Sequence, residues 1–145
     1  MFRIAARRTA TFIAVLACAA ATAYLVFFLF GPTYTRCSIT QILPGQVASG
    51  PGECSSVSWV QMTFSEPGPR DLRALWFLGA WTLAPYVALV GTRLPSTAPA
   101  IALVAIALVV DLTSIISMGG GFVYAILCGP LLLLALVATA TSRMG

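Results

Sequence analysis

The chain has no histidine and no lysine, and only 8% of its 145 residues are charged. Soluble proteins carry about 25% charged residues, so this composition excludes an ordinary soluble domain. The sequence also lacks paired carboxylates, a nucleophile beside a base, a set of metal ligands and a nucleotide-binding loop. We therefore expect no enzyme, no catalytic residues, no metal and no cofactor.

Apolar residues make up 59% of the chain and gather in four long stretches. About 20 such residues in a helix cross a hydrocarbon core roughly 30 Å thick, and a backbone in lipid must be helical. We predict an all-α membrane protein, a four-transmembrane-helix bundle with a small extracytoplasmic β-hairpin, forming one integral membrane domain over residues 1–145. The helices are expected at about 9–30, 72–90, 98–118 and 122–140, with an outer loop at about 31–71.

The distribution of arginines indicates the orientation of this bundle. Five arginines fall on one side of the four spans and three on the other, and the positive-inside rule makes the richer side cytoplasmic. Both termini are then cytoplasmic, and the loop 31–71 is extracytoplasmic. We interpret the first span as an uncleaved anchor because its apolar run is longer than that of a signal peptide. The five are Arg3, Arg7, Arg8, Arg93 and Arg143, and the three are Arg36, Arg70 and Arg73.

Two of the four cysteines, Cys37 and Cys54, lie in the expected outer loop, whereas Cys18 and Cys128 lie in spans. An oxidising compartment favours a disulfide between the first two, which would stabilise the loop by about 3 kcal/mol. The alternative of a thiol oxidoreductase lacks both a Cys-x-x-Cys motif and a histidine that could tune a thiolate.

Segments on either side of this pair have the composition of strands. Residues 33–43 (TYTRCSITQIL) and 54–64 (CSSVSWVQMTF) are rich in β-branched and aromatic residues, and 44–53 (PGQVASGPGE) is typical of a turn. In the second strand Val57 and Trp59 would share one face. Trp59 is the exposed aromatic that we expect to contact headgroups or a partner, unless it packs on its own bundle. Asp71 is a predicted cap of the second span.

One carboxylate, Asp111, lies inside the third span, and depth places it level with Tyr24, Gly79 and Cys128. Ser114 lies three residues on and shares its helical face. Either Asp111 pairs with Arg73, or it stays neutral and donates a hydrogen bond to Tyr24. A third interpretation makes it a proton or cation site, because ionisable residues at such depth are often functional.

The next connection is "GGG", Gly119 to Gly121, which predicts a tight antiparallel turn with a left-handed glycine cap.

The segment YTRCS soon after the first span and the ending GGGFVYAILCGPLLLLALVA carry a resemblance to a known group. The chain resembles, over nearly its whole length, a loose family of small four-span bacterial integral membrane proteins with a disulfide-linked outer loop. The resemblance implies a bacterial plasma membrane and no catalytic residues. It is carried by Gly120, Gly121, Phe122, Tyr124 and Pro130.

These observations favour a non-enzymatic accessory, assembly or interaction protein of the bacterial cell envelope. Its expected partners are the lipid bilayer and another membrane protein or itself, and no nucleic acid. The alternative is a small proton-linked transporter or channel subunit that uses Asp111.

Overall fold

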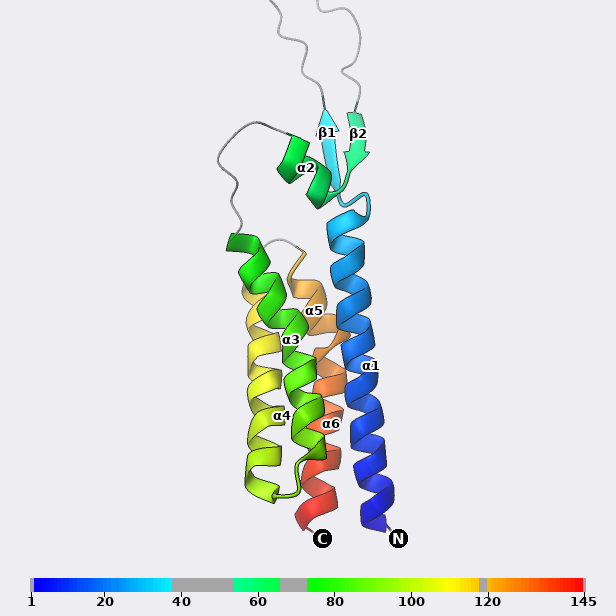
Figure 1. Cartoon of the computed structure of the whole chain (residues 1–145), viewed down its shortest axis with the longest axis vertical. Helices are drawn as coiled ribbons and strands as arrows, with labels where there is room; N and C mark the ends of the chain where they lie inside the picture. Colours follow the sequence, from blue (N-terminus) through cyan, green and yellow to red (C-terminus); the bar gives the residue numbers. More distant parts are fainter. Residues whose placement is uncertain (1, 38–53, 66–72, 118–119, 145) are drawn as a thin grey trace, which may run out of the picture. The chain divides into compact units, whose positions relative to one another are not determined.

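The computed structural model describes residues 2–37, 54–65, 73–117 and 120–144, which are mostly helical (Figure 1). The chain divides into two compact units. The first, which we call the helical unit, comprises Met1–Leu25 and Leu72–Gly145. The second, the hairpin unit, comprises Val26–Asp71. The single domain expected from the sequence stays a prediction.

Three helices have the length and apolar composition needed to cross a membrane. They are α1 (Phe2–Phe30), α3 (Arg73–Arg93) and α4 (Thr97–Leu112), the last of which continues into a 3₁₀ turn, η1 (Thr113–Ile116). Each matches an apolar stretch of the sequence. The prediction of long apolar helices is therefore confirmed for the first three stretches, with ends shifted by a few residues except at the start of α1.

The fourth apolar stretch, expected as one helix at 122–140 with a kink at Gly129-Pro130, forms two helices that meet next to that position, and a fourth span stays a prediction. α5 (Phe122–Leu127) and α6 (Gly129–Met144) meet at Cys128. Pro130 has no N–H to donate back along the helix, which interrupts the regular bonding there. Helical bonds continue on both sides, from the Cys128 amide to the Tyr124 carbonyl (2.7 Å) and from the Leu132 amide to the Cys128 carbonyl (2.8 Å).

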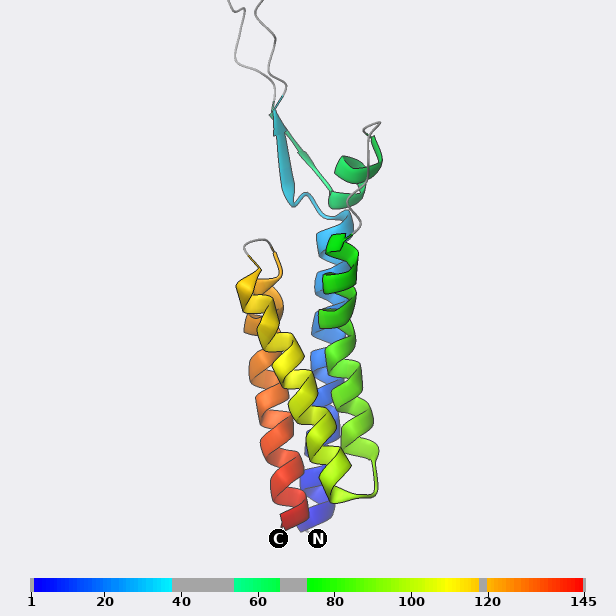
Figure 2. The same ribbon diagram turned by 90° about the vertical axis from the view of Figure 1, so that its left-hand side faces the viewer.

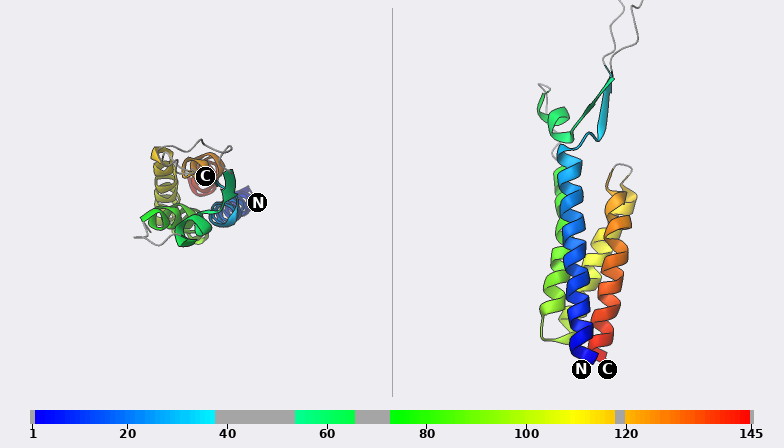
Figure 3. Two further views of the ribbon diagram at one scale, coloured as in Figure 1. Left: turned by 90° about the horizontal axis from the view of Figure 1, so that it is seen from above. Right: turned by 90° about the vertical axis from the view of Figure 1, so that its right-hand side faces the viewer.

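In the helical unit, α1, α3, α4 and the α5–α6 pair run side by side (Figures 2 and 3). The buried residues of each include a line spaced alternately by three and four, the spacing of helices that pack at small crossing angles. We call these lines seams. They consist of Ala10, Ala14, Ala17 and Ala21 in α1; Leu78, Trp81, Pro85, Ala88 and Thr92 in α3; Ala100, Val104, Ala107, Asp111 and Ser114 in α4; and Gly121, Ala125, Cys128, Leu132, Ala135 and Thr139 in α5–α6.

Small residues in the seams allow close approach of neighbouring helices. A β-carbon added to Gly91 of α3 would lie 3.0 Å from the Leu103 Cβ and 3.1 Å from the Ala100 carbonyl oxygen of α4. Side-chain fit of this kind is the main source of helix association in lipid. The α3–α4 pair is accordingly closely packed.

The two ends of the helical unit's chain lie beside the turn that joins α3 to α4 (Figure 1). Arg7 donates from Nη2 to the Arg93 carbonyl at 2.7 Å, and Arg143 donates from Nη1 to the Pro95 carbonyl at 2.7 Å. Arg143 also donates from Nη2 to the Leu94 carbonyl. These bonds satisfy carbonyls that the end of α3 leaves unpaired, and they place Arg7, Arg93 and Arg143 at one end, as expected.

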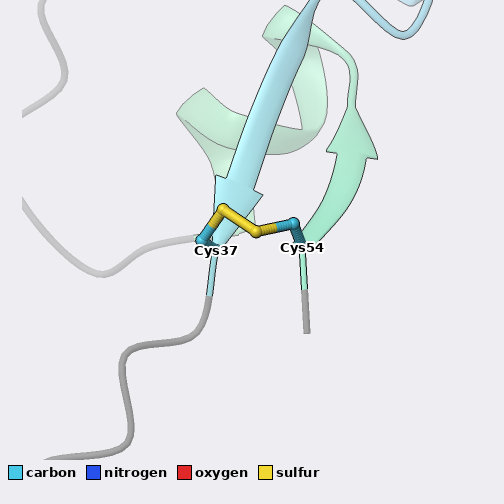
Figure 4. Close-up of a disulfide and its surroundings, with 2 residues drawn as sticks. All are labelled: Cys37 and Cys54. Atoms are coloured by element: carbon cyan, nitrogen blue, oxygen red, sulfur yellow. A yellow bond between two sulfur atoms is a disulfide. The ribbon is translucent and has the colours of Figure 1, made fainter. Parts of the chain in front are cut away.

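The hairpin unit contains β1 (Tyr34–Cys37) paired antiparallel with β2 (Cys54–Val57). Cys37 lies directly opposite Cys54, and the two form a disulfide, as expected (Figure 4). At the other end of the pair Tyr34 lies opposite Val57, and its ring contacts Phe28 edge-on. The expected turn 44–53 and the cap Asp71 lie outside the described residues.

The second strand ends earlier than expected, because residues 59–65 form a helix, α2 (Trp59–Ser65). Ser58 Oγ accepts from the Gln61 amide at 3.1 Å, and Gln61 Oε1 accepts from the Ser58 amide at 3.0 Å. This reciprocal pair is a capping box, which begins a helix. The two-faced strand through Phe64 is therefore wrong. Of the two interpretations of Trp59, the exposed aromatic is wrong, since its side chain is only 6% exposed. The alternative, that it packs on the rim of its own bundle, stays a prediction.

Gly121 is required because a side chain at this position would collide with its neighbours. It does not supply the expected left-handed cap. Its backbone is right-handed helical, with φ −60° and ψ −37°. A β-carbon there would lie 2.5 Å from Trp81 Cζ3 and 2.7 Å from Ser117 Cβ. The last glycine of the connection thus lets the start of α5 pack against Trp81 of α3.

We predict that Gly121→Ala lowers the free energy of unfolding by about 1–3 kcal/mol, because the added methyl must displace a buried indole. The matched control is Gly79→Ala in α3, where an added β-carbon meets nothing within 4 Å. That change should be neutral or stabilise by up to about 1 kcal/mol, since alanine favours a helix. Denaturant titration of the purified protein, followed by circular dichroism, checks both; equal midpoints would contradict the crowding at Gly121.

Candidate functional site

Asp111 occupies a position in the α4 seam and is 0% exposed. Neither of its carboxyl oxygens has a hydrogen-bond partner within the part of the chain that the structure describes. Across the bundle it meets the break between α5 and α6, where a β-carbon on Gly129 would lie 3.5 Å from Asp111 Oδ2. Gly129 thus faces the carboxyl group at ordinary van der Waals distance.

Tyr124 and Cys128 are the ionisable groups near enough to Asp111 to interact with it electrostatically. The Cys128 thiol donates to the Ala17 carbonyl of α1 at 3.7 Å. Cys128 had been placed level with Asp111 from depth alone, and the structure brings the two together. Tyr124, which is 0% exposed, was not part of that expected layer.

Neither of the two partners expected for Asp111 forms a hydrogen bond with its carboxyl oxygens within the described residues. That Asp111 is held neutral stays a prediction. Tyr24 donates its hydroxyl hydrogen to the Gly120 carbonyl at 2.6 Å instead of meeting the carboxyl group. Its ring packs edge-on against Tyr124, with 4.9 Å between centroids. Arg73, the first residue of α3, is exposed and makes no hydrogen bond to Asp111. The carboxyl group is therefore enclosed without either expected partner.

Ser114 does share the buried face of Asp111, as its spacing predicted, and is 0% exposed. Its Oγ accepts from the Ala125 amide at 3.1 Å. This hydrogen bond joins η1, which follows α4, to α5. Gly79 does not join this layer, because its missing side chain faces open space.

Several other polar side chains of the helical unit join one helix to another. Thr82 Oγ1 donates to the Leu78 carbonyl at 2.7 Å, so the 2.8 Å contact with Tyr124 is a hydrogen bond donated by the tyrosine hydroxyl. Trp81 Nε1 donates to Thr113 Oγ1 at 3.2 Å. Two further pairs join α1 to α3. The Thr22 Oγ1 atom lies 2.7 Å from the Tyr86 hydroxyl, and Thr11 Oγ1 donates to Thr92 Oγ1 at 3.4 Å.

Two grooves open on the surface of the helical unit. One of about 490 Å³ is lined by Arg7, Arg8, Thr11 and Phe12 of α1. The other, of about 380 Å³, is lined by Phe77 and Trp81 of α3 and by Thr113, Ile116 and Ser117 after α4. Asp111 lines neither of these grooves, so neither forms an open route to its carboxyl group.

Metal binding at Asp111 is poorly supported. Among the residues with described positions, no three histidine, cysteine, aspartate or glutamate side chains are grouped to hold a metal ion. Cys18 and Cys128 are free thiols and are both buried. The chemistry that remains to the site is that of one enclosed carboxyl group, able to hold or release a proton.

Comparison with known proteins gives no relative from which a role could be transferred. No family model matches the chain, and neither a curated protein nor a solved structure matches it.

Proposed function

We propose that this chain is a four-span protein of the bacterial plasma membrane, with both termini cytoplasmic and residues 31–71 outside. In this proposal it acts without catalysis, as an accessory or assembly protein that contacts another membrane protein. The resemblance to small four-span bacterial membrane proteins is part of the same proposal.

The seam of the last two helices supports a fourth span. Its buried positions keep the alternation of three and four through the break at Cys128. Gly129–Arg143 alone is an apolar helix shorter than a membrane span. Together with α5 it gives a helical path of 23 residues from Phe122 to Met144, uncharged as far as Ser142, which is within the length range of a membrane span.

The cytoplasmic placement of the termini is supported by the arginines at their end of the helical unit. Arg7, Arg93 and Arg143 all contribute atoms to the bonds around the α3–α4 turn. Basic residues within short loops and tails are retained on the cytoplasmic side of a membrane. The disulfide of the hairpin unit agrees with an oxidising compartment on the other side.

The observation that carries the accessory role is the use of polar side chains for helix packing. Thr82 with Tyr124, Trp81 with Thr113, and Ser114 with the Ala125 amide each join two elements of the bundle. Each of these polar groups therefore already has a partner within the bundle, although Trp81 and Thr113 also line the smaller groove. The hairpin unit offers exposed polar surface outside the spans, at Thr35, Ser55 and Ser56.

We predict that the protein purified from its native membrane in mild detergent carries a second membrane protein at a reproducible ratio. Replacing both Cys37 and Cys54 by serine should reduce the amount of partner at least severalfold, because the hairpin that presents the contact loses its cross-link. Quantitative mass spectrometry of the purified complex measures the ratio. The control is Cys18→Ala, which removes a thiol that forms no disulfide.

Recovery of the chain only as copies of itself, in wild type and variants alike, would contradict the accessory role. Retention of the partner by the double serine variant would place the contact away from the hairpin unit.

The proposed orientation is tested by single probes at two exposed serines, Ser65 at the end of α2 and Ser96 between α3 and α4. We expect a membrane-impermeant maleimide to label Ser65→Cys in intact cells and Ser96→Cys only after the membrane is opened. Both native free thiols are buried, so background labelling should be low. The reverse pattern would invert the topology.

A second candidate function follows from the enclosed carboxyl group of Asp111, which has no partner among the described residues. Burial of an ionised group costs several kcal/mol, and proteins retain such groups in spans mostly at functional positions. Under this alternative, the protein conducts protons as a small transporter or channel subunit.

Proton flux into vesicles that contain the purified protein separates the two candidates. If Asp111 conducts protons, Asp111→Asn should abolish the flux, while Asp111→Glu keeps a carboxyl group and part of the rate. A pH-sensitive dye inside the vesicles reports the flux. If the accessory role is correct, wild type shows no flux above empty vesicles, and Asp111→Asn leaves partner recovery unchanged.

A further inference from the structure

The end of the helical unit that holds the termini is positively charged and has no acidic residue in its sequence. Of the four acids of the chain, Glu53, Glu66 and Asp71 belong to the hairpin unit and lie outside the described residues. The fourth, Asp111, is enclosed in the α4 seam and is 0% exposed. Among the described residues, no exposed carboxylate therefore neutralises the charges of Arg7, Arg8 and Arg93.

The Arg7 guanidinium uses only some of its N–H donors to bond to the protein. Its Nη2 atom donates to the Arg93 carbonyl at 2.7 Å, which directs the guanidinium toward the end of α3. A guanidinium has five N–H donors, so most remain for another acceptor. Arg8, the next residue, is exposed and has no hydrogen bond within the described part of the chain.

Arg7 and Arg8 line the groove of about 490 Å³, and its lining changes from charged to aromatic along α1. Arg7 and Arg8 are followed one helical turn later by Thr11 and Phe12, so all four share one side of α1. The turn adds about 6 Å along the helix, and Phe12 is 63% exposed. The groove thus has a cationic rim at the terminus end and an aromatic wall nearer the middle of the span.

We propose that this groove binds an anionic phospholipid, with its phosphate at Arg7 and Arg8 and its acyl chain along Phe12. The inference rests on the proposed insertion of the chain in a membrane. Guanidinium groups bind phosphate oxygens through paired hydrogen bonds. A headgroup with net negative charge suits two unneutralised arginines better than a zwitterion does, and the aromatic wall gives a lipid an advantage over free phosphate. The volume is within the range of small-molecule sites.

The test measures which lipid stays bound when the full-length protein is released from nanodiscs. The nanodiscs contain equal amounts of phosphatidylglycerol and phosphatidylcholine with identical acyl chains, and native mass spectrometry gives the ratio of retained lipids. Wild type should favour phosphatidylglycerol. The ratio of retained phosphatidylglycerol to phosphatidylcholine should fall about fivefold in Arg8→Gln. It should fall roughly tenfold or more in the Arg7→Gln/Arg8→Gln pair.

The matched control is Arg93→Gln, which removes one charge at the same end but does not line the groove. It should keep the preference, because Arg7 bonds to the main chain of Arg93 and not to its side chain. Equal losses in Arg93→Gln and Arg8→Gln would overturn the groove in favour of a diffuse surface charge. If the loss of Arg7 disturbs folding, the Arg8→Gln variant alone still tests whether the groove prefers the anionic lipid.

Two further measurements distinguish a wrong ligand from a failure of membrane insertion. Displacement of the lipid by inorganic phosphate would show that the groove takes a free anion and would overturn the lipid proposal. Extraction of the protein from membranes by alkaline carbonate would contradict both membrane insertion and this inference. Firm membrane insertion with no preference for phosphatidylglycerol would overturn only this inference.

Discussion

The helical unit depends on narrow seams of mostly small residues that let helices approach closely. Where chains pack in lipid, side-chain fit replaces the hydrophobic effect as the main source of association. Alanines at positions 10, 14, 17 and 21 give α1 a seam with almost no side-chain volume. Gly91 does the same locally between α3 and α4, where an added methyl would crowd Leu103. Polar groups are accepted in this packing when they pair across it, as Thr82 and Tyr124 do. Asp111 is the exception, because it lies in a seam but has no partner among the described residues.

The hairpin unit is stabilised in a different way. Its paired strands are short, and an isolated hairpin of this size is marginal in water. The disulfide cross-links the pair at Cys37 and Cys54, and the Ser58–Gln61 capping box converts the following segment to a helix. A covalent bond and a local hydrogen-bond motif thus support a unit with few residues available for a core. This contrast follows from composition, since long apolar runs are absent from residues 31–71.

The lengths of the apolar runs predicted the first three long helices, whereas Pro130 interrupts the helix in the fourth run. The Cys37–Cys54 pair could be predicted from its shared segment and the lack of a redox motif. Residues 59–64 were misassigned because the aromatic and β-branched content suggested a strand, although Ser58 and Gln61 carried a capping signal three residues apart. Around Asp111, depth correctly indicated Cys128 and helical spacing indicated Ser114. The Tyr24 contact could not be predicted, because depth gives the level of a residue but not the direction of its side chain.

The enclosed position of Asp111 affects how the chain can be inserted during synthesis. The residues that enclose it on the far side, among them Tyr124, Cys128 and Gly129, come later in the chain. At ordinary rates of synthesis, Gly129 follows Asp111 from the ribosome after roughly one to four seconds. During that interval α4 carries its carboxyl group without the helices that will cover it. A chain inserted span by span would therefore need the translocation machinery to retain α4 beside water or protein until α5 and α6 arrive.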